Sequence, residues 1–184
     1  MKAIETVYNG YRFRSRLEAR WAVFFDACGI KYLYEPEGYK LSDGTMYLPD
    51  FYLSDIKTWF ECKGIMTEDD SHKIDMFANE SNMPIAIGYS DLTFQSPILD
   101  GNGSSFGISS YKENSVIGEC YECKKIYFLS EEGSYRCPCC GYYDGGRTFD
   151  WKASGDDPLD SREPVVSAFQ KARQARFEHG EKPI

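Results

Sequence analysis

The alternation of apolar and polar positions predicts a small α/β core in the first half of the chain. Residues 6–13 alternate around Asn9-Gly10, which is a typical signal for a β-hairpin. Ser15 then begins a helix whose large apolar side chains recur on one face, and Gly29 ends it. Further on, the pattern predicts strands at 31–34, about 46–53 and 58–63, a helix at about 67–79 and a strand at 84–89. The order is therefore helix, three strands as a meander, helix and strand, and the last two strands form a parallel pair with a right-handed crossover.

The second half of the chain has a weaker pattern. We expect one hairpin between 90 and 115, followed by a cysteine-rich module at 116–146. A basic helix at about 164–177 lies in the tail, which comprises 147–184. Two interpretations of this helix stay open, namely docking onto the body or a second subunit, and contact with phosphate. These boundaries leave residues 1–115 as the main domain.

Composition allows an aromatic-rich core and argues against a membrane span. Of the 184 residues, 42% are apolar and 16% are aromatic, and the longest apolar runs are too short to cross a bilayer. The N-terminus lacks the charged and then apolar plan of a signal peptide, so we expect a cytoplasmic protein. Seven cysteines in a reducing compartment favour metal ligands and buried thiols over disulfides.

The net charge of −8 argues against bulk attraction to nucleic acid, but the charge is unevenly distributed. The basic residues cluster at both ends of the chain, as Arg12, Arg14, Arg16 and Arg20 and as Lys171, Arg173 and Arg176. Arg14 and Arg16 are candidates for contacts with nucleic-acid phosphates, and simple solvation is the alternative. A DNA partner therefore stays open.

Ionisable residues inside an aromatic stretch are the main candidates for chemistry, because unpaired charges in a buried sheet are costly. Asp50 follows Pro49, which disfavours a central ladder position, so we expect Asp50 at an open rim. Glu61 and Lys63 share one face of the next strand, since side chains two apart point the same way. Asp50 and Glu61 can bind Mg²⁺ or Mn²⁺, and the carbonyl of Cys62 can supply a third ligand. Lys63 would orient a water molecule or stabilise developing charge; a buried ion pair between Lys63 and either acid is the alternative.

These residues resemble a known signature. Asp50 after a proline, then Glu61-Cys62-Lys63, and a preceding helix that bears Glu18 together resemble the PD-(D/E)xK nuclease superfamily, which has a restriction-endonuclease-like αβββαβ core. Three stretches resemble small nuclease-like proteins common in phages and mobile elements, namely 13–22, 34–36 and 47–51.

The resemblance covers about residues 4–90 and implies a metal-dependent endonuclease that hydrolyses DNA in a bacterial or phage-infected cell. It implies Asp50 and Glu61 as Mg²⁺ ligands and Lys63 as the catalytic lysine. Glu18 would be an acid beside the metal, although it also has the spacing of a capping box with the serine three residues before it. Cleavage of branched DNA would need a symmetric dimer. The alternative function is a catalytically silent module that binds nucleic acid or a protein partner, with the zinc ribbon as an adaptor to a larger protein assembly.

Two Cys-x-x-Cys pairs separated by thirteen residues predict a zinc site. The pairs are Cys120 with Cys123 and Cys137 with Cys140. Four thiolates suit tetrahedral Zn²⁺, and we expect a hairpin at 125–135 between the pairs. The module resembles a zinc ribbon, and the metal would supply much of its folding energy. Redox chemistry is the alternative, and Cys139 is a spare thiol that could replace Cys140.

Overall fold

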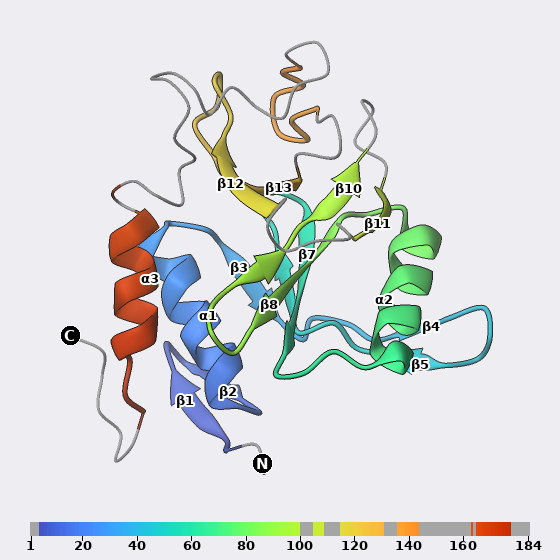
Figure 1. The fold of residues 1–184 in the computed structure, drawn as a ribbon, viewed down its shortest axis with the longest axis horizontal. Helices are drawn as coiled ribbons and strands as arrows, with labels where there is room; N and C mark the ends of the chain where they lie inside the picture. The colour runs from blue at the N-terminus through green and yellow to red at the C-terminus, as the bar shows by residue number, and fades with distance from the viewer. Residues whose placement is uncertain are drawn as a thin grey trace.

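Five strands form a mixed sheet at the centre of the protein, in the order β3-β6-β7-β8-β9 (Figure 1). The computed structural model describes residues 4–99, 105–108, 115–130, 136–143, 163 and 165–177. The elements of the sheet and the two helices beside it are α1 (Arg16–Ala27), β3 (Tyr32–Tyr34), β6 (Phe51–Leu53), β7 (Thr58–Lys63), α2 (Glu68–Ser81), β8 (Ile85–Tyr89) and β9 (Phe94–Gln95).

Five strands, β3 to β7, lie between α1 and α2 along the chain, and three of them (β3, β6 and β7) belong to the central sheet. β7 and β8 run parallel, and α2 forms the crossover between them. The other neighbours in the sheet are antiparallel. The predicted mixed α/β class is therefore confirmed.

The strand predicted over 46–53 is interrupted in the structure. β5 (Met46–Tyr47) pairs with β4 (Tyr39–Lys40) in a separate two-stranded ribbon, and β6 begins only at Phe51. Pro49 stands in the gap, where its missing N–H cannot contribute to a ladder. The chain therefore leaves the ribbon and enters the sheet with Asp50 at the edge of β6.

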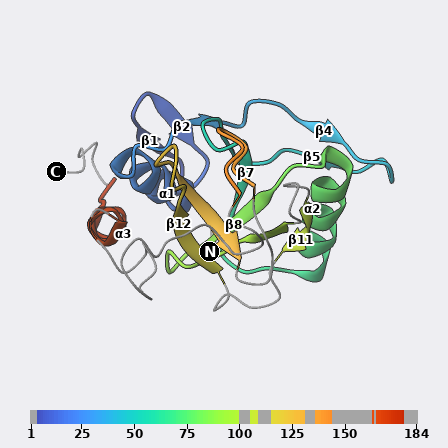
Figure 2. The ribbon, with the colours of Figure 1, turned by 90° about the horizontal axis from the view of Figure 1, so that it is seen from above.

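Alternate side chains of β7 enter two different cores. Phe60 packs on the α1 side, with ring centroids 4.7 Å from Trp21 and 5.0 Å from Phe25. Trp59 packs on the α2 side, 5.5 Å from Phe77. The two helices therefore cover opposite faces of the sheet, as the view from above also shows (Figure 2).

The N-terminal hairpin forms where the sequence predicts it. β1 (Thr6–Tyr8) pairs with β2 (Tyr11–Phe13) in antiparallel register. Asn9 and Gly10 both have positive φ, 47° and 83°, which is what a two-residue hairpin turn of type I′ requires.

The basic helix of the tail, α3 (Val165–Gln174), packs along α1 (Figure 1). The ring of Phe169 lies 4.4 Å from that of Phe24 and 6.4 Å from that of Trp21. Arg173 stays on the exposed side and lies over the Phe169 ring at 5.4 Å. The helix thus docks onto the body of the protein while it presents its charges outward. None of the three described helices combines the length and apolar character needed to span a bilayer.

The cysteine module is built on an antiparallel pair, β12 (Ser115–Glu119) and β13 (Ile126–Ser130). β13 lies within the hairpin expected over 125–135 and pairs with β12 across the first cysteine pair, which buries apolar side chains of both strands. Residues 131–135 lie outside the described residues.

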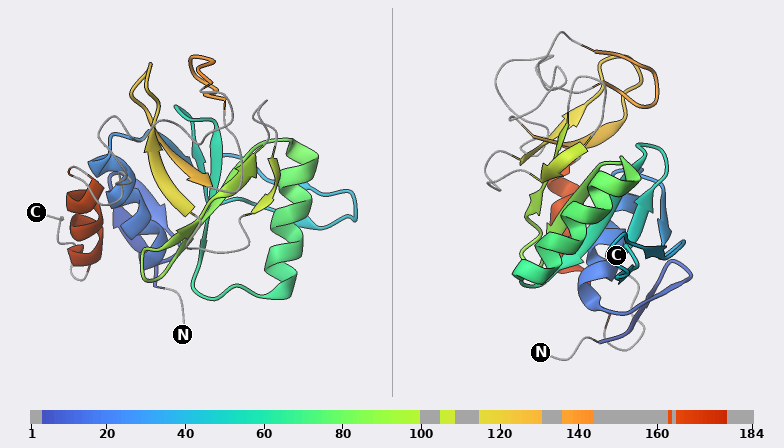
Figure 3. Two further views of the ribbon diagram at one scale, coloured as in Figure 1. Left: turned by 45° about the horizontal axis from the view of Figure 1, so that its top comes forward. Right: turned by 90° about the vertical axis from the view of Figure 1, so that its right-hand side faces the viewer.

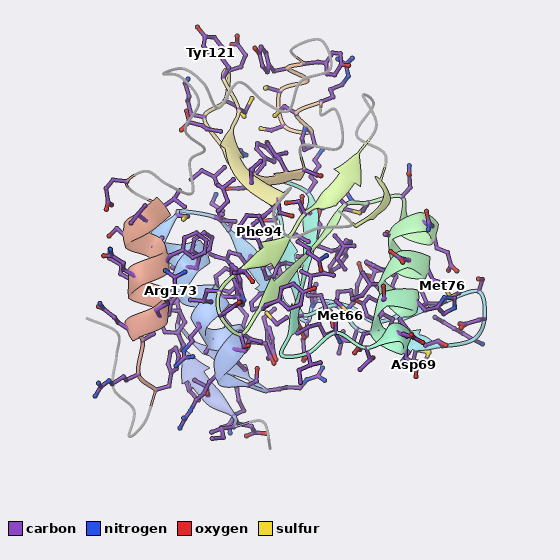
Figure 4. All side chains as sticks on the ribbon, in the orientation of Figure 1. Met66, Asp69, Met76, Phe94, Tyr121 and Arg173 are labelled. Atoms are coloured by element: carbon purple, nitrogen blue, oxygen red, sulfur yellow. The ribbon has the colours of Figure 1, made fainter. Side chains whose placement is uncertain are left out.

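The module shares the main apolar core. Phe128 of β13 lies 5.2 Å from Phe60 and 5.1 Å from Phe94, measured between ring centroids. Figure 3 places the module against one end of the sheet, and Phe94 is labelled at the centre of Figure 4. Nearby, β10 (Pro97–Leu99) and β11 (Ser105–Ile108) form the antiparallel pair expected in this part of the chain.

Candidate functional site

Asp50 and Glu61 meet at the edge where β6 begins and β7 approaches its end. Because Phe51 pairs with Phe60 in antiparallel register, position 50 stands opposite position 61. The backbone N–H of Asp50 donates to Oε2 of Glu61 at 3.3 Å. The N–H of Cys62 donates to Oδ2 of Asp50 at 2.7 Å. The two strand backbones therefore hold both carboxyl groups in place.

Burial raises the pKa values of both of these carboxyl groups. Burial raises the pKa of Asp50 well above its ordinary value, and the nearby charge of Glu61 raises it further. Burial also raises the pKa of Glu61, while Lys63 and a hydroxyl group oppose the shift. Among the described residues, no donor reaches Oδ1 of Asp50. This oxygen can therefore accept a cation, which would relieve the repulsion between the carboxylates.

Tyr47 of β5 fixes the orientation of Glu61. Its hydroxyl donates to Oε2 of Glu61 at 2.9 Å, and Oε1 of the same carboxylate lies 3.0 Å from Nζ of Lys63. Tyr47 is buried, and burial raises the pKa of its hydroxyl. Sequence reasoning missed this contact, because the ribbon that carries Tyr47 is a separate element of the fold.

Lys63 bridges the sheet and α2. Besides Glu61, its Nζ contacts Oδ1 of Asp70 at 2.9 Å. Asp70 is the third residue of α2 and closes a capping box with Thr67. Partial burial opposes the charged form of Lys63, but the two carboxylates outweigh it and raise the pKa of the lysine. The ion pair with Glu61 that the sequence allows is thus present. Asp70 is an additional partner of Lys63. The Thr67-x-x-Asp70 spacing in the sequence indicates the start of α2, and with it the place of Asp70 in the first turn.

Glu18 lies at the start of α1, where three local donors hold it. Its Oε2 accepts from the hydroxyl of Tyr34 at 2.5 Å and from the N–H of Arg14 at 3.0 Å. Its Oε1 accepts from the hydroxyl of Ser15 at 2.5 Å. After burial and Glu61, the charge of Glu18 also raises the pKa of Asp50. Glu18 therefore combines hydrogen bonding at the helix start with proximity to the carboxylate pair.

The two arginines predicted to contact phosphate lie in different surroundings. Arg14 forms an ion pair with Glu35, whose backbone N–H donates to the carbonyl of Asp50 at 2.8 Å. Glu35 has a positive φ of 44°, so it turns sharply at the edge of the carboxylate site. Arg16 begins α1 and lines a separate pocket beside α3. Arg14 is thus near the carboxylates but already paired.

The four predicted zinc ligands converge, and their Sγ atoms all lie within 4.8 Å of one another. The Sγ atoms of Cys120 and Cys140 are 3.5 Å apart, and those of Cys123 and Cys137 are 3.6 Å apart. Tetrahedral zinc with Zn–S bonds of about 2.3 Å requires sulfur–sulfur distances of about 3.8 Å. Within the described residues, this is the one group of three or more His, Cys, Asp or Glu side chains that is close enough to hold a metal ion. The cluster fits zinc, and it uses Cys140 rather than Cys139.

The two cysteine pairs have matching backbone turns. The N–H of Lys124 donates to the carbonyl of Cys120 at 2.9 Å, and the N–H of Gly141 donates to that of Cys137 at 2.8 Å. Lys124 and Gly141 both have positive φ, 58° and 78°. Burial raises the pKa of Cys137, but hydrogen bonds from the Tyr127 hydroxyl and from two backbone amides lower it to about 7. The Tyr127 hydroxyl and the turn amides therefore favour a thiolate at Cys137, whereas burial raises the pKa of Cys120 and of Cys123.

Comparisons with models of known protein families, with curated proteins and with solved structures gave no match to this chain.

Proposed function

We propose that this protein is a metal-dependent endodeoxyribonuclease with Asp50, Glu61 and Lys63 at its centre. The observation that carries the proposal is the meeting of the buried Glu61, the partly buried Asp50 and the ammonium group of Lys63 at adjacent strand ends. Asp50, Glu61 and the carbonyl of Cys62 offer the hard oxygen ligands that Mg²⁺ and Mn²⁺ prefer. The helix, three-strand, helix, strand order supports the proposal, because it is the order that the PD-(D/E)xK resemblance implies.

The chain's own residues would divide the chemistry between them. A divalent cation at these oxygens supplies positive charge beside a scissile phosphate. Lys63 is kept charged by Glu61 and Asp70, so it can stabilise negative charge that develops on the phosphate or orient an attacking water. Glu18, anchored by Tyr34, adds a further carboxylate near Asp50.

The test is cleavage of DNA by the purified, zinc-loaded protein. Plasmid, linear, single-stranded and branched DNA are incubated with Mg²⁺, with Mn²⁺ and with neither ion. We expect cleavage only with a divalent ion and a loss on the order of 10³-fold in Asp50→Ala and in Lys63→Ala. Asp69→Ala is the matched control, because Asp69 is an exposed acid beside Asp70 that makes no contact with the carboxylate pair. Absence of cleavage on every substrate, or full cleavage by both site variants, would refute the proposal.

A second candidate function is binding of nucleic acid without cleavage, and the contacts of Lys63 are compatible with it. The ammonium of Lys63 already has two carboxylate partners, which a purely structural ion pair would also have. On the cysteine module, Tyr121 (labelled in Figure 4) is 50% exposed. Its ring stacks on that of Tyr142 with centroids 5.9 Å apart, which is the kind of aromatic surface on which bases stack. A module that binds nucleic acid without cutting would bind it equally well with and without Mg²⁺. Tyr121→Ala would then weaken binding, whereas Asp50→Ala would not.

A further inference from the structure

A basic pocket lies between α1 and the C-terminal end of α3. Its volume is about 300 Å³, and its lining is Arg16, Arg20, Ala175, Arg176 and Phe177. This volume is at the lower end of the range for sites that bind small molecules or parts of larger ligands. Among the described residues, the lining contains three arginines and no acidic side chain.

The pocket faces away from the carboxylate site. Arg16 and Arg20 are four residues apart, so they lie on the same side of α1. Glu18 is two residues from Arg16, which is roughly 200° around the helix. The same helix therefore presents Glu18 toward the carboxylate pair and the two arginines toward α3.

The arginines near the N-terminus differ in their partners. Arg12 pairs with Glu5 at 3.4 Å, and Arg14 pairs with Glu35. Within the described residues, Arg20 has no carboxylate partner, and its Nε is buried without a hydrogen-bond acceptor. A buried donor that lacks an acceptor is costly and needs an explanation, such as a ligand. Arg20 is therefore the arginine of this cluster with a buried N–H group for which the described residues supply no acceptor.

Packing of the tail helix builds the pocket. Arg176 and Phe177 follow α3 and are brought to α1 because Phe169 packs against Phe24. The ring of Phe177 is in turn 6.1 Å from that of Tyr8. Arg176 is exposed, and no acidic side chain of the described residues pairs with it. The docked tail therefore adds a third guanidinium to the two on α1.

We propose that this pocket binds a phosphate of the DNA backbone away from the cleavage site, with Arg20 and Arg176 as its main ligands. The choice of DNA as the source of the phosphate rests on the proposed nuclease function. A guanidinium group matches a phosphate with two parallel hydrogen bonds, and the buried Nε of Arg20 gains the acceptor that it lacks. The chain as a whole carries a charge of −8, so a local basic cluster is needed to attract DNA to one face.

The test measures binding of a labelled DNA duplex by fluorescence anisotropy, using the full, zinc-loaded chain without Mg²⁺ at several salt concentrations. In the double variant Arg20→Gln/Arg176→Gln, we expect Kd to rise about tenfold and the salt slope to fall by about one. Arg173→Gln is the matched control. Arg173 belongs to α3, three residues before Arg176, but its guanidinium lies over the Phe169 ring and does not line the pocket. We expect its Kd to change less than about twofold.

Each outcome bears on one proposal. Equal Kd values for the double variant and Arg173→Gln would overturn the pocket assignment. Calorimetric binding of inorganic phosphate that the double variant loses, with DNA binding unchanged, would assign the pocket to free phosphate and overturn its assignment to DNA. Arg176 is exposed, so Arg176→Gln alone remains an informative folded variant if Arg20→Gln unfolds. Absence of cleavage on every substrate, or full cleavage by both Asp50→Ala and Lys63→Ala, would instead refute the nuclease function and leave the binding result standing.

Discussion

Gly88 of β8 allows α1 to pack closely on the sheet. Its replacement by alanine should lower the free energy of unfolding. A Cβ at this position would lie 2.4 Å from a ring carbon of Trp21 and 2.5 Å from two ring carbons of Phe60. Carbon atoms in contact are normally about 3.5–4.0 Å apart, so the methyl group overlaps both rings by about 1 Å or more. Both rings are fully buried and pack on each other at 4.7 Å, so neither can swing aside.

The cost follows from two opposing effects. Overpacking of a filled core costs about 1–3 kcal/mol, and the enclosed rings place Gly88→Ala at the upper end. Replacing glycine by alanine also lowers the conformational entropy of the unfolded chain, which offsets about 0.4–1 kcal/mol of the overpacking cost. The free energy of unfolding should therefore fall by about 2 kcal/mol. For a protein of this size, that corresponds to a Tm lower by about 4–8 °C.

The assay is thermal unfolding followed by circular dichroism, with Gly38→Ala as the matched control. A Cβ at Gly38 would meet the carbonyl oxygen of Tyr47 at 3.7 Å, which is an ordinary contact. Gly88 also pairs with Cys62 in the sheet, so pushing α1 outward should move Glu18 away from the carboxylate pair and slow cleavage. A Tm for Gly88→Ala within about 2 °C of the wild type would refute this reasoning.

The remaining predictions concern the cysteine cluster and the start of α2. Cys120→Ser should lower the zinc content per chain and expose the amides of the module to hydrogen exchange, whereas Cys139→Ser should change neither. Equal zinc content in both variants would contradict the assignment. Hydrogen bonds from Thr67 and Lys63 lower the pKa of Asp70 from 3.8 to about 2. Its contribution to stability is therefore complete above pH 4 and is lost as the pH falls from about 4 to about 2. Because Asp70 is partly exposed, Asp70→Asn should cost only about 1 kcal/mol at pH 7, and the difference from wild type in urea unfolding should vanish near pH 2. A difference that persists there would argue against the ion pair.

The order of the core elements could be predicted because it depends on local signals. Ser15 caps α1, Gly29 follows its end with a positive φ of 68°, and the turn at Asn9-Gly10 closes the first hairpin. The alternation along β7 places Phe60 and Trp59 on opposite faces, as the period of a strand requires. These features need no knowledge of distant contacts.

The partners of the charged residues could not be predicted in the same way. The hydroxyl of Tyr47 reaches Glu61 across 14 positions, and that of Tyr34 reaches Glu18 across 16. Which arginines of the N-terminal cluster line the pocket beside α3 depends on where that helix docks, and the sequence pattern leaves that docking open. Sequence reasoning therefore located Asp50, Glu61 and Glu18, but not the hydroxyl of Tyr47 that orients Glu61 or that of Tyr34 that orients Glu18.

The position of Phe128 couples the stability of the cysteine cluster to that of the strand that carries Glu61. This ring belongs to the hairpin that carries the first cysteine pair, yet it lies within 5.2 Å of Phe60, one residue from Glu61. Unfolding of the hairpin when zinc is scarce would remove the contact between Phe128 and Phe60, the residue next to Glu61 in β7. Loss of zinc would then loosen Glu61, which we propose as a ligand of a divalent cation, although Glu61 is not part of the four-cysteine cluster.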